Sequence, residues 1–309
     1  MGRLASLGDQ IERDFGRKNQ LAVLFLIKLK VKENFYFMTK KLVKKYYQEY
    51  GIKEWKRLIQ DPYHKLEFDT TLHFFKKYLP KKGLILDAGG GPGRYTIELA
   101  KLGYNVVLLD LTPELLRIAK RKIKKEKVQN KVKQIIQGSI DNLSMFEDNT
   151  FDAVICLGGT LSHLVNKAKR EKAIDELIRV TKKNAPFFIS VIGRLAVLVG
   201  ELVRFPKEIE IKEVFQRIRD SGDYFGGYGF APCHLYLPEE LEKSLKKRKI
   251  KVLQMVGLEG LATYHPQETN QLVKKHPKAW KIWWETHLKT CTHPVAVGIS
   301  EHFMIICKK

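Results

Sequence analysis

One glycine-rich loop has the residue types and spacing of a ligand-binding site. It reads Asp87-Ala88-Gly89-Gly90-Gly91-Pro92-Gly93 and follows the short apolar strand predicted for Leu84-Ile85-Leu86. Glycines between a strand and a helix leave the backbone without side chains, so a ligand can approach the positive end of the helix. We therefore expect a nucleotide-type cofactor at this loop.

The glycine spacing separates the possible cofactors. A dinucleotide fingerprint requires Gly-x-Gly-x-x-Gly, and in the three available frames Arg94, Pro92 or Thr96 stands where a glycine is needed. The spacing that does occur is Asp-x-Gly-x-Gly-x-Gly, from Asp87 to Gly93. A nicotinamide or flavin dinucleotide is therefore disfavoured.

A second acidic residue, Asp110, ends the next predicted strand, 23 residues after Asp87. A carboxylate in that position can accept hydrogen bonds from both ribose hydroxyls of a cofactor. Its other interpretation is a cap for the helix that we expect after Thr112, itself the predicted N-cap. Leu111, directly beside the carboxylate, is expected to pack on an adenine ring.

A third stretch completes the pattern. Gln137-Gly138-Ser139-Ile140 is followed by Leu143 and then by the run Asn149-Thr150-Phe151-Asp152-Ala153-Val154. Together with the glycine loop and Asp110, these motifs resemble the class I, Rossmann-like methyltransferases, and among them the type-11-like enzymes. The resemblance runs from about residue 40 to the C-terminus. It implies S-adenosyl-L-methionine as cofactor and a transferase of the EC 2.1.1 type.

The resemblance also assigns cofactor-binding residues. In that family the first-strand acid holds the amino-acid end of the cofactor, and the glycines let the backbone pass beneath its methionine and ribose parts. The usual Asp at the adenine amino group is Ser139 here, so either the Ser139 hydroxyl or Asp141 is expected to make that contact. The expected set is Asp87, Ala88, Gly89, Gly90, Gly91, Gly93, Asp110, Leu111, Ser139, Ile140, Leu157 and Gly158, with Tyr46 and Tyr47 covering the methionine end.

The acceptor is expected beside Leu157-Gly158-Gly159-Thr160-Leu161-Ser162-His163, because ligands in such sheets lie beyond the carboxyl ends of the strands. Thr160 and Ser162 are candidate substrate contacts. The segment lacks the Asn/Asp-Pro-Pro-Tyr/Phe signature of enzymes that methylate amino groups of nucleic-acid bases, which disfavours an exocyclic base nitrogen. His163 and His234 are candidate general bases, since imidazole titrates near neutrality, or they are packing residues.

Further candidates follow the fifth predicted strand. Arg194 is placed to meet an anionic group, and Tyr224, Phe225, Tyr228 and Phe230 offer an aromatic wall either for a substrate or for the core. The histidines show no spacing typical of a metal site, so no metal is expected.

A parallel sheet is needed to bring these residues together, and the sequence pattern predicts one. Short apolar runs alternate with helices from Leu84 onward, which is typical of a doubly wound α/β fold. We expect a mostly parallel seven-stranded sheet with helices on both faces, an antiparallel last strand, and helical or loop insertions after strands 5 and 6. The predicted strands are 84–86, 106–109, 132–136, 151–157, 186–192, 251–256 and 302–307, and the predicted helices are 95–102, 113–125, 167–181 and 238–247.

The chain is expected to divide around this sheet. Residues 1–37 are predicted to be an N-terminal extension, helical or poorly ordered, with Met38 as an alternative natural start. Its apolar run at 21–27 is closed by lysines and suits a surface-lying amphipathic helix better than a membrane span. One methyltransferase domain is expected over 38–309. It comprises helices at 38–83, divided in two at Asp61-Pro62, a cofactor-binding core at 84–193, and substrate-side insertions at 194–237 and 258–298.

The composition is globular, but its charge is unusual. The 309 residues carry a formal net charge of +22, which suggests a polyanionic partner such as RNA, DNA or an anionic membrane surface, or else lysine-rich solvated helix faces. Four scattered cysteines without a Cys-x-x-Cys pair argue against a disulfide framework and fit a reducing cytoplasm.

Our lead hypothesis is a cytoplasmic methyltransferase that acts on a small molecule by in-line displacement, in which positioning supplies most of the acceleration. The alternative is a tRNA or rRNA methyltransferase that uses the basic surface, because some type-11-like enzymes act on small molecules and others on tRNA wobble bases. A further alternative, from another class, is a non-catalytic cofactor-binding subunit of a complex.

Overall fold

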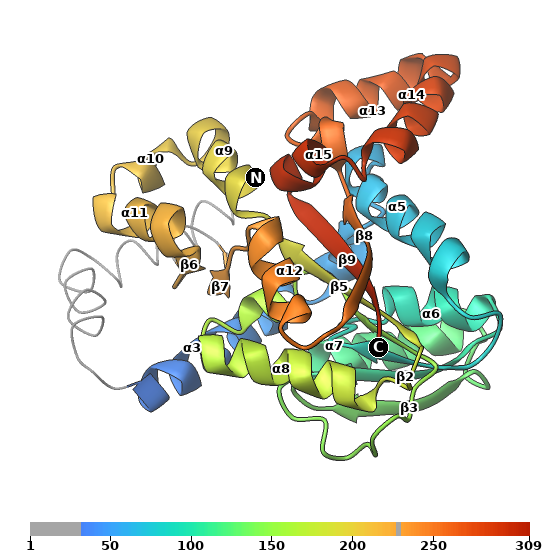
Figure 1. The fold of residues 1–309 in the computed structure, drawn as a ribbon. Helices are drawn as coiled ribbons and strands as arrows, with labels where there is room; N and C mark the ends of the chain where they lie inside the picture. Colours follow the sequence, from blue (N-terminus) through green and yellow to red (C-terminus); the bar gives the residue numbers. More distant parts are fainter. Residues whose placement is uncertain (1–31, 227–229) are drawn as a thin grey trace.

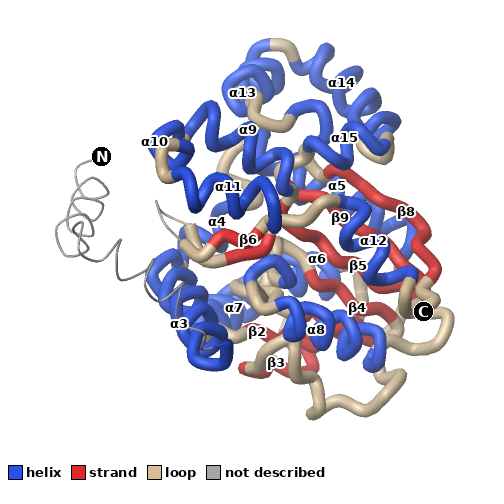
Figure 2. Tube along the Cα trace, turned by 60° about the vertical axis from the view of Figure 1, so that its left-hand side comes forward, coloured by secondary structure: helices blue, strands red, loops and turns tan. Residues whose placement is uncertain are grey.

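Seven strands form one sheet in the order β3-β2-β1-β4-β5-β9-β8. The computed structural model describes residues 32–226 and 230–309, and helices cover both faces of the sheet (Figures 1 and 2). Neighbouring strands run parallel from β3 to β5, whereas β9 is antiparallel to both β5 and β8. This confirms the predicted α/β fold. The strands are β1 (Leu84–Ala88), β2 (Asn105–Asp110), β3 (Val132–Gln137), β4 (Ala153–Cys156), β5 (Pro186–Ile192), β8 (Lys251–Gly257) and β9 (His302–Lys308).

Helices fill the connections between these strands. Those of the core follow the predicted alternation closely: α6 (Arg94–Lys101), α7 (Pro113–Lys125), the short 3-10 helix η1 (Leu161–His163), α8 (Lys167–Val180) and α12 (Pro238–Lys246). Before β1 lie α3 (Lys32–Tyr50), α4 (Ile52–Arg57) and α5 (Pro62–Tyr78).

Side chains alternate between the two faces of each strand, and this sorts the core into layers. Ile85 of β1 packs in one layer with Phe75 of α5, whereas its neighbour Leu86 packs in the other with Leu177 of α8. All four side chains are almost fully buried. Burying one such side chain contributes roughly 1.5–3 kcal/mol, so the apolar runs that predict the strands also stabilise the fold.

The helices before β1 differ from the prediction. We expected two helices divided at Asp61-Pro62, and the structure has three, because α3 ends before Gly51. Gly51 has a φ of 42°, a left-handed conformation that favours glycine and interrupts a helix. The break leaves α4 as a separate short helix between α3 and α5.

Two smaller differences concern the ends of elements. The fourth strand is shorter than the predicted 151–157, because Phe151 makes only an isolated bridge with Thr181. Thr112 occupies the N-cap position of α7, but its side chain makes no capping hydrogen bond. Its backbone N–H instead donates to Asp110 Oδ1 at 2.8 Å. The predicted N-cap position of Thr112 is therefore confirmed, although its side chain makes no capping hydrogen bond.

Two insertions stand at the same end of the molecule (Figure 1). Helices α9 and α15, one from each insertion, pack on each other. A small two-stranded sheet, β6–β7, lies within the insertion expected at 194–237 and was not predicted. Tyr228 lies outside the described residues. The elements are α9 (Arg194–Arg204), α10 (Pro206–Ile209), α11 (Lys212–Ser221), β6 (Asp223–Tyr224) and β7 (Cys233–His234) after β5, and η2 (Gly260–Ala262), α13 (Pro266–Lys275), α14 (Pro277–Thr290) and α15 (Pro294–Ile299) after β8.

None of the helices in the described ranges combines the length and the apolar character that a membrane crossing requires. All four cysteines are buried and unpaired.

The two insertions meet at Gly193, which predicts a steric effect on stability. A Cβ atom on Gly193 would lie 2.3 Å from the carbonyl oxygen of Ser300, although its φ of −79° is ordinary. Gly193→Ala should therefore lower the free energy of unfolding by about 1–3 kcal/mol through overpacking. Gly298 in α15 has no atom near an added Cβ. Gly298→Ala, the matched control, should leave stability unchanged or raise it by up to about 1 kcal/mol. Urea unfolding of the two variants measures the difference, and equal stability would contradict the close approach.

Candidate functional site

A cavity lies at the carboxyl ends of β1, β2 and β4. It has a volume of about 1060 Å³, including space open to solvent, and helices α3 and α4 contribute the wall that the strands do not. Side chains predicted from distant parts of the sequence meet there because parallel strands end at one edge of the sheet. The predicted residues that line it are Tyr47, Asp87, Gly89, Gly90, Gly91, Asp110, Leu111, Ser139, Ile140, Leu157, Gly158, Thr160 and His163.

The glycine loop is shaped by close approaches of the chain. A Cβ atom on Gly89 would lie 2.2 Å from Cγ2 of Thr160, and one on Gly90 would lie 2.4 Å from Cγ of Asp87. On Gly91, by contrast, an added Cβ would have no atom nearer than 3.6 Å. Neighbouring side chains of the protein therefore require glycine at positions 89 and 90. The open space beside Gly91 is part of the cavity.

Two predicted loop residues support the loop without lining the cavity. Ala88 is fully buried in the core with the side chains of the neighbouring strands. Gly93 precedes α6 with a φ of 81°, and a Cβ on it would lie 3.3 Å from that of Ala119. This corrects the expectation that both contact the cofactor directly.

Asp110 presents an oriented carboxylate to the cavity. Its Oδ2 accepts the backbone N–H of Gly91 at 2.9 Å, and its Oδ1 accepts that of Thr112 at 2.8 Å. Burial raises the pKa of this carboxyl to about 6, although the two N–H donors oppose the shift. A carboxylate has about four acceptor positions, so about two remain for hydroxyl donors of a ligand.

Asp87 lies at the end of the adjacent strand and is more strongly perturbed. Burial raises the pKa of its carboxyl to about 7, against the hydrogen bond from Thr96 Oγ1 to Oδ2 at 2.6 Å. The negative charge of Asp110 raises this pKa further. A cationic group bound beside Asp87 would favour its charged form, so this corner of the cavity suits an ammonium.

Ser139 and Asp141, the alternatives for the adenine contact, lie next to each other. The Ser139 hydroxyl donates to Asp141 Oδ1 at 2.5 Å, and Lys169 approaches the other oxygen of Asp141 at 3.6 Å. Ser139 lines the main cavity, whereas Asp141 lines an adjoining hollow together with Lys169. The structure thus places Ser139 nearer to a cavity ligand, with Asp141 behind it.

Tyr47 and His163 form a hydrogen-bonded pair across the cavity. The Tyr47 hydroxyl lies 2.8 Å from Nε2 of His163, and Nδ1 lies 3.0 Å from the carbonyl oxygen of Pro232. Because a carbonyl only accepts, Nδ1 carries the proton and Nε2 accepts from Tyr47. Burial lowers the pKa of His163 to about 4, so the ring is neutral at physiological pH.

An aromatic cluster surrounds this pair. The Tyr46 ring lies 5.2 Å from that of Tyr47 and 5.7 Å from that of Phe230, and the Phe230 ring lies 5.7 Å from His163. Tyr46 itself does not line the cavity. It therefore backs Tyr47, which corrects its predicted place over the cofactor.

The side chains of Arg194 and His234 make hydrogen bonds within and beside the first insertion. The Arg194 guanidinium donates to the carbonyl oxygens of Leu235 and Ser221 and to Glu240 Oε2. The ring nitrogens of His234 lie 2.6 Å from Asp223 and 2.8 Å from Glu240. Both residues are buried, and neither lines the cavity. The expectations of an anion contact for Arg194 and of a general base at His234 are therefore corrected to structural roles.

Ser162 and Tyr224 are likewise buried away from the cavity. The Ser162 Oγ accepts the backbone N–H of Ile192 at 3.1 Å. The Tyr224 side chain packs in a separate core cluster with Ile218, and its hydroxyl donates to Glu208 at 3.4 Å. Their predicted substrate contacts are not found in this structure.

Arg57, the cation that α4 brings into the cavity, was not among the predicted site residues. Its Nε donates to Glu54 at 3.0 Å, and Nη1 and Nη2 approach the two carboxylate oxygens of Glu67 at 2.5 and 3.4 Å. A guanidinium has five N–H donors, so two remain. A Cβ on Gly158 would lie 3.4 Å from Nη2. The one signal was local: Glu54 and Arg57 are three residues apart on a helix.

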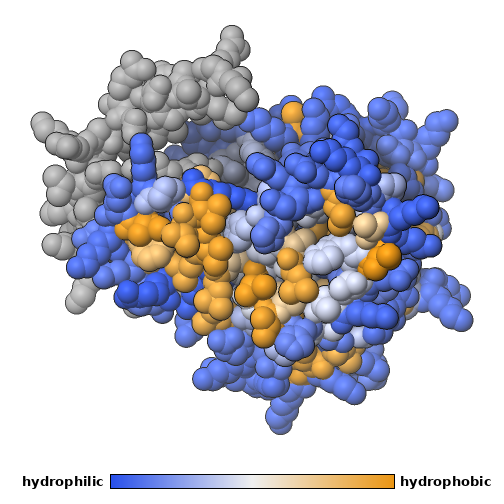
Figure 3. Space-filling model, turned by 90° about the horizontal axis from the view of Figure 1, so that it is seen from above, coloured by the Kyte–Doolittle hydropathy of each residue, from blue (hydrophilic) through white to orange (hydrophobic). Residues whose placement is uncertain are grey.

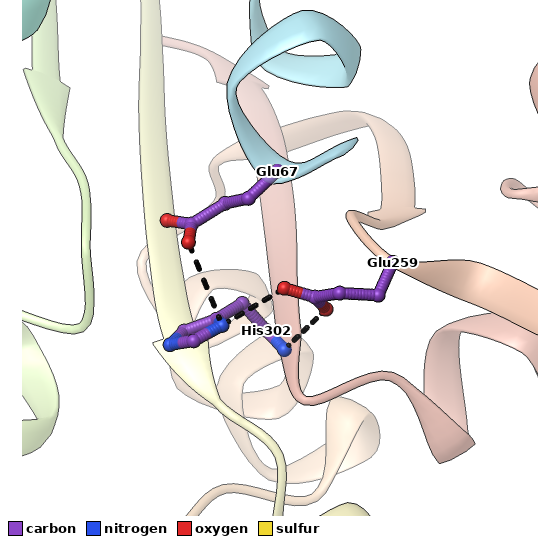
Figure 4. A group of neighbouring side chains, drawn as sticks. All are labelled: Glu67, Glu259 and His302. Atoms are coloured by element: carbon purple, nitrogen blue, oxygen red, sulfur yellow. Dashed lines mark hydrogen bonds and ion pairs between the residues drawn. The ribbon is translucent and has the colours of Figure 1, made fainter. Parts of the chain in front are cut away.

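Behind Arg57 lies a buried network of charges (Figure 4). His302 Nδ1 lies 3.0 Å from Glu259 and 3.8 Å from Glu67. These three residues have the types and proximity of metal ligands. Burial opposes protonation of His302, but the two carboxylates outweigh it and raise the pKa to about 9. Arg57 thus pairs with Glu54 and Glu67, and the His302 imidazolium faces Glu67 and Glu259, so each of these carboxylates has a cationic partner within the protein.

Comparison with known proteins agrees with this site. Residues 85–184 match the methyltransferase domain family. The chain is 33% identical over 113 residues to a glycine/sarcosine N-methyltransferase of Parasynechococcus marenigrum, covering 36% of this chain and 39% of that protein. It is 35% identical over 104 residues to a ubiquinone/menaquinone biosynthesis C-methyltransferase of Zymomonas mobilis, covering 34% and 40%. The chain thus spans about two fifths of the length of these curated relatives.

The likeness among solved structures is broader but more distant. A SAM-dependent methyltransferase of Methanosarcina mazei superimposes with a TM-score of 0.53 at 20% identity, covering 76% of this chain and 96% of that one. At this identity the likeness shows the fold alone. The domain match at residues 85–184 identifies that segment as a methyltransferase domain, in agreement with the predicted family and with the S-adenosylmethionine cofactor that the family implies.

The buried network predicts a pH-dependent contribution to stability. The pKa of His302 is about 9 in the folded protein and about 6.5 when unfolded. Its contribution should be fully present below about pH 6.5 and be lost as the pH rises through about 9, by up to about 3 kcal/mol. His302→Gln should remove this pH dependence, measured by urea unfolding across that range. His265→Gln, at an exposed histidine, is the control; equal profiles for both variants would contradict the prediction.

The two strand-end carboxyls predict pH-dependent cofactor binding. With pKa values of about 7 and about 6, Asp87 and Asp110 protonate as the pH falls, and the affinity for S-adenosylmethionine should drop by up to about tenfold per pH unit for each group. Titration calorimetry from about pH 8 to about pH 5 measures this effect. Asp110→Asn should weaken binding at every pH and flatten the profile near pH 6. Asp220→Asn, at an exposed acid, should match the wild type. A pH-independent affinity would overturn the assignment.

Proposed function

Because residues 85–184 form a class I S-adenosylmethionine-dependent methyltransferase domain, we propose that this protein transfers a methyl group from S-adenosylmethionine to a small-molecule acceptor. The cavity itself supports the cofactor part of the proposal. Its glycine loop has no side chains between the cavity and the largely buried Asp87 and Asp110, which line it, and these carboxylates have unused acceptor capacity.

Three charged side chains would hold the cofactor. Asp110 would accept its ribose hydroxyls, Asp87 would face its ammonium, and Arg57 would donate its two remaining N–H groups to its carboxylate. Ser139 and Ile140 would border its adenine. S-adenosylmethionine supplies a methyl group on a positively charged sulfur, which an acceptor nucleophile displaces in line.

The observation that carries the small-molecule acceptor is the wall made by α3. Lys40, Val43 and Tyr47 of that helix line the cavity, and the Tyr47 hydroxyl is bonded to His163 on the opposite side. An acceptor must therefore fit between these helices and the strand ends. Two curated relatives carry names of small-molecule methyltransferases, which agrees with this proposal.

The Tyr47–His163 pair suits an acceptor hydroxyl better than an amine. Tyr47 Oη can accept a hydrogen bond from the acceptor while it donates its own proton to Nε2 of His163. A hydroxyl oxygen becomes strongly acidic as it bonds to the methyl group, so even a weakly basic imidazole can receive its proton through Tyr47. Thr160, whose hydroxyl donates to the Gly89 carbonyl oxygen at 3.1 Å, holds the neighbouring loop in place.

The test measures S-adenosylhomocysteine formation with a catechol, with sarcosine and with total tRNA as separate acceptor probes. We expect turnover with the catechol. Tyr47→Phe and His163→Asn should each reduce kcat by about a hundredfold or more, with little change in the affinity for S-adenosylmethionine. Tyr78→Phe on α5 is the matched control and should retain full activity. Turnover with tRNA alone, or with none of the probes, would overturn the proposal.

A further inference from the structure

Helix α9 leaves an apolar stripe on the surface. Leu195, Val199 and Leu202 follow the i, i+4, i+7 spacing that places side chains on one helical face, and Val203 lies beside them. Leu202 is 70% exposed and Val203 is 62% exposed. Other sides of α9 are packed instead: Val197 and Leu198 contact the buried cluster around Ile218, and a Cβ on Gly200 would lie 2.6 Å from the Tyr264 hydroxyl. The exposed stripe is therefore not needed to hold the helix in place.

The stripe continues onto the second insertion. Helix α15, which packs on α9, exposes Val295 and Ile299, and η2 exposes Leu261. With Phe205 at the C-cap of α9, eight of the fifteen exposed large apolar side chains in the described ranges belong to this region, which we call the α9–α15 face. Figure 3 shows apolar side chains gathered there and bordered by hydrophilic ones. Such clustering marks an interaction surface, whereas single exposed apolar residues do not.

Charge distinguishes the possible partners of this face. On α13 and α14 the exposed lysines Lys274, Lys275, Lys278 and Lys281 outnumber the exposed acids Glu268 and Glu285, so this flank is basic. On the other flank Lys207 and Lys212 alternate with Glu210 and Glu213. The whole chain carries a formal net charge of +22. A second copy would bring the same charge and be repelled, whereas an anionic surface would be attracted.

We propose that the α9–α15 face docks the protein on an anionic membrane surface. Apolar side chains of an amphipathic helix enter the boundary between headgroups and acyl chains, and basic side chains pair with anionic lipids. Stable anchoring generally needs two such signals together, and this face supplies both. Lysine stems can extend along the apolar area while their ammonium groups reach the headgroups.

Helix α9 of the docking face belongs to the first insertion, which also contains Phe230 between β6 and β7. The Phe230 ring lies 5.7 Å from that of His163, a residue that lines the cavity. The docking proposal stands on the surface alone and is independent of the reaction proposed above.

Vesicle co-sedimentation of the full chain tests the proposal. The probes are vesicles of phosphatidylcholine alone and of phosphatidylcholine mixed with phosphatidylglycerol. We expect binding to the mixed vesicles only, weakening with added salt because surface charges are screened. The double variant Leu202→Glu/Val203→Glu should lower the partition coefficient by more than about tenfold. Leu102→Glu, at a similarly exposed leucine on the C-cap of α6, should bind like the wild type.

Each other outcome counts against the proposal. Equal binding by the wild type and the double variant would place the attachment elsewhere, such as the apolar run at 21–27. Equal binding to neutral and mixed vesicles would show that docking does not depend on anionic lipids, which contradicts the proposal. Failure to bind either vesicle, with a dimer seen by light scattering that the double variant abolishes, would assign the face to a second copy. Urea unfolding of both variants checks that the surface substitutions leave the fold intact.

Discussion

Two carboxylates are buried at the ends of neighbouring parallel strands. The cofactor region depends on hydrogen-bond donors that offset the desolvation of these two groups. Burial raises the pKa of Asp87 to about 7 and that of Asp110 to about 6, because the charged forms lose hydration. Donors from Thr96, Gly91 and Thr112 offset part of this cost. They are available because each strand is followed at once by a tight turn and a helix. The remaining hydrogen-bond acceptor positions of the two carboxylates face the cavity. They can therefore bind a ligand that is rich in hydrogen-bond donors.

The other wall of the cavity depends on charges that are far apart in the chain. Arg57 lines the cavity, but it is held by Glu67 of α5, which faces His302 on the last strand and Glu259 beyond β8 (Figure 4). Breaking such a buried pair costs about 3–5 kcal/mol, because the partner is left as an uncompensated charge. The position of Arg57 is thus coupled to the closing edge of the sheet.

Three histidines show how burial and neighbours give one side chain different properties. His163 is partly buried and bonded to two uncharged groups, its pKa falls to about 4, and it can accept a hydrogen bond from Tyr47. His302 is held between two carboxylates, and its pKa rises to about 9. His234 bridges Asp223 and Glu240 and joins β7 to α12. Of these three, only His163 lines the cavity. Residue type alone does not separate a candidate base from a buried ion pair.

The sequence by itself determined the order of strands and helices, the glycine loop and the acids at two strand ends. These features follow from local periodicity and from the rule that parallel strands end at one edge, and both are readable along the chain. Only the tertiary structure brought Arg57 into the cavity and turned Arg194 and His234 inward. A buried polar group bonds to whichever partner the fold brings within reach. Glu67 and Glu259 are nearly two hundred residues apart, and no local pattern records that they face the same histidine.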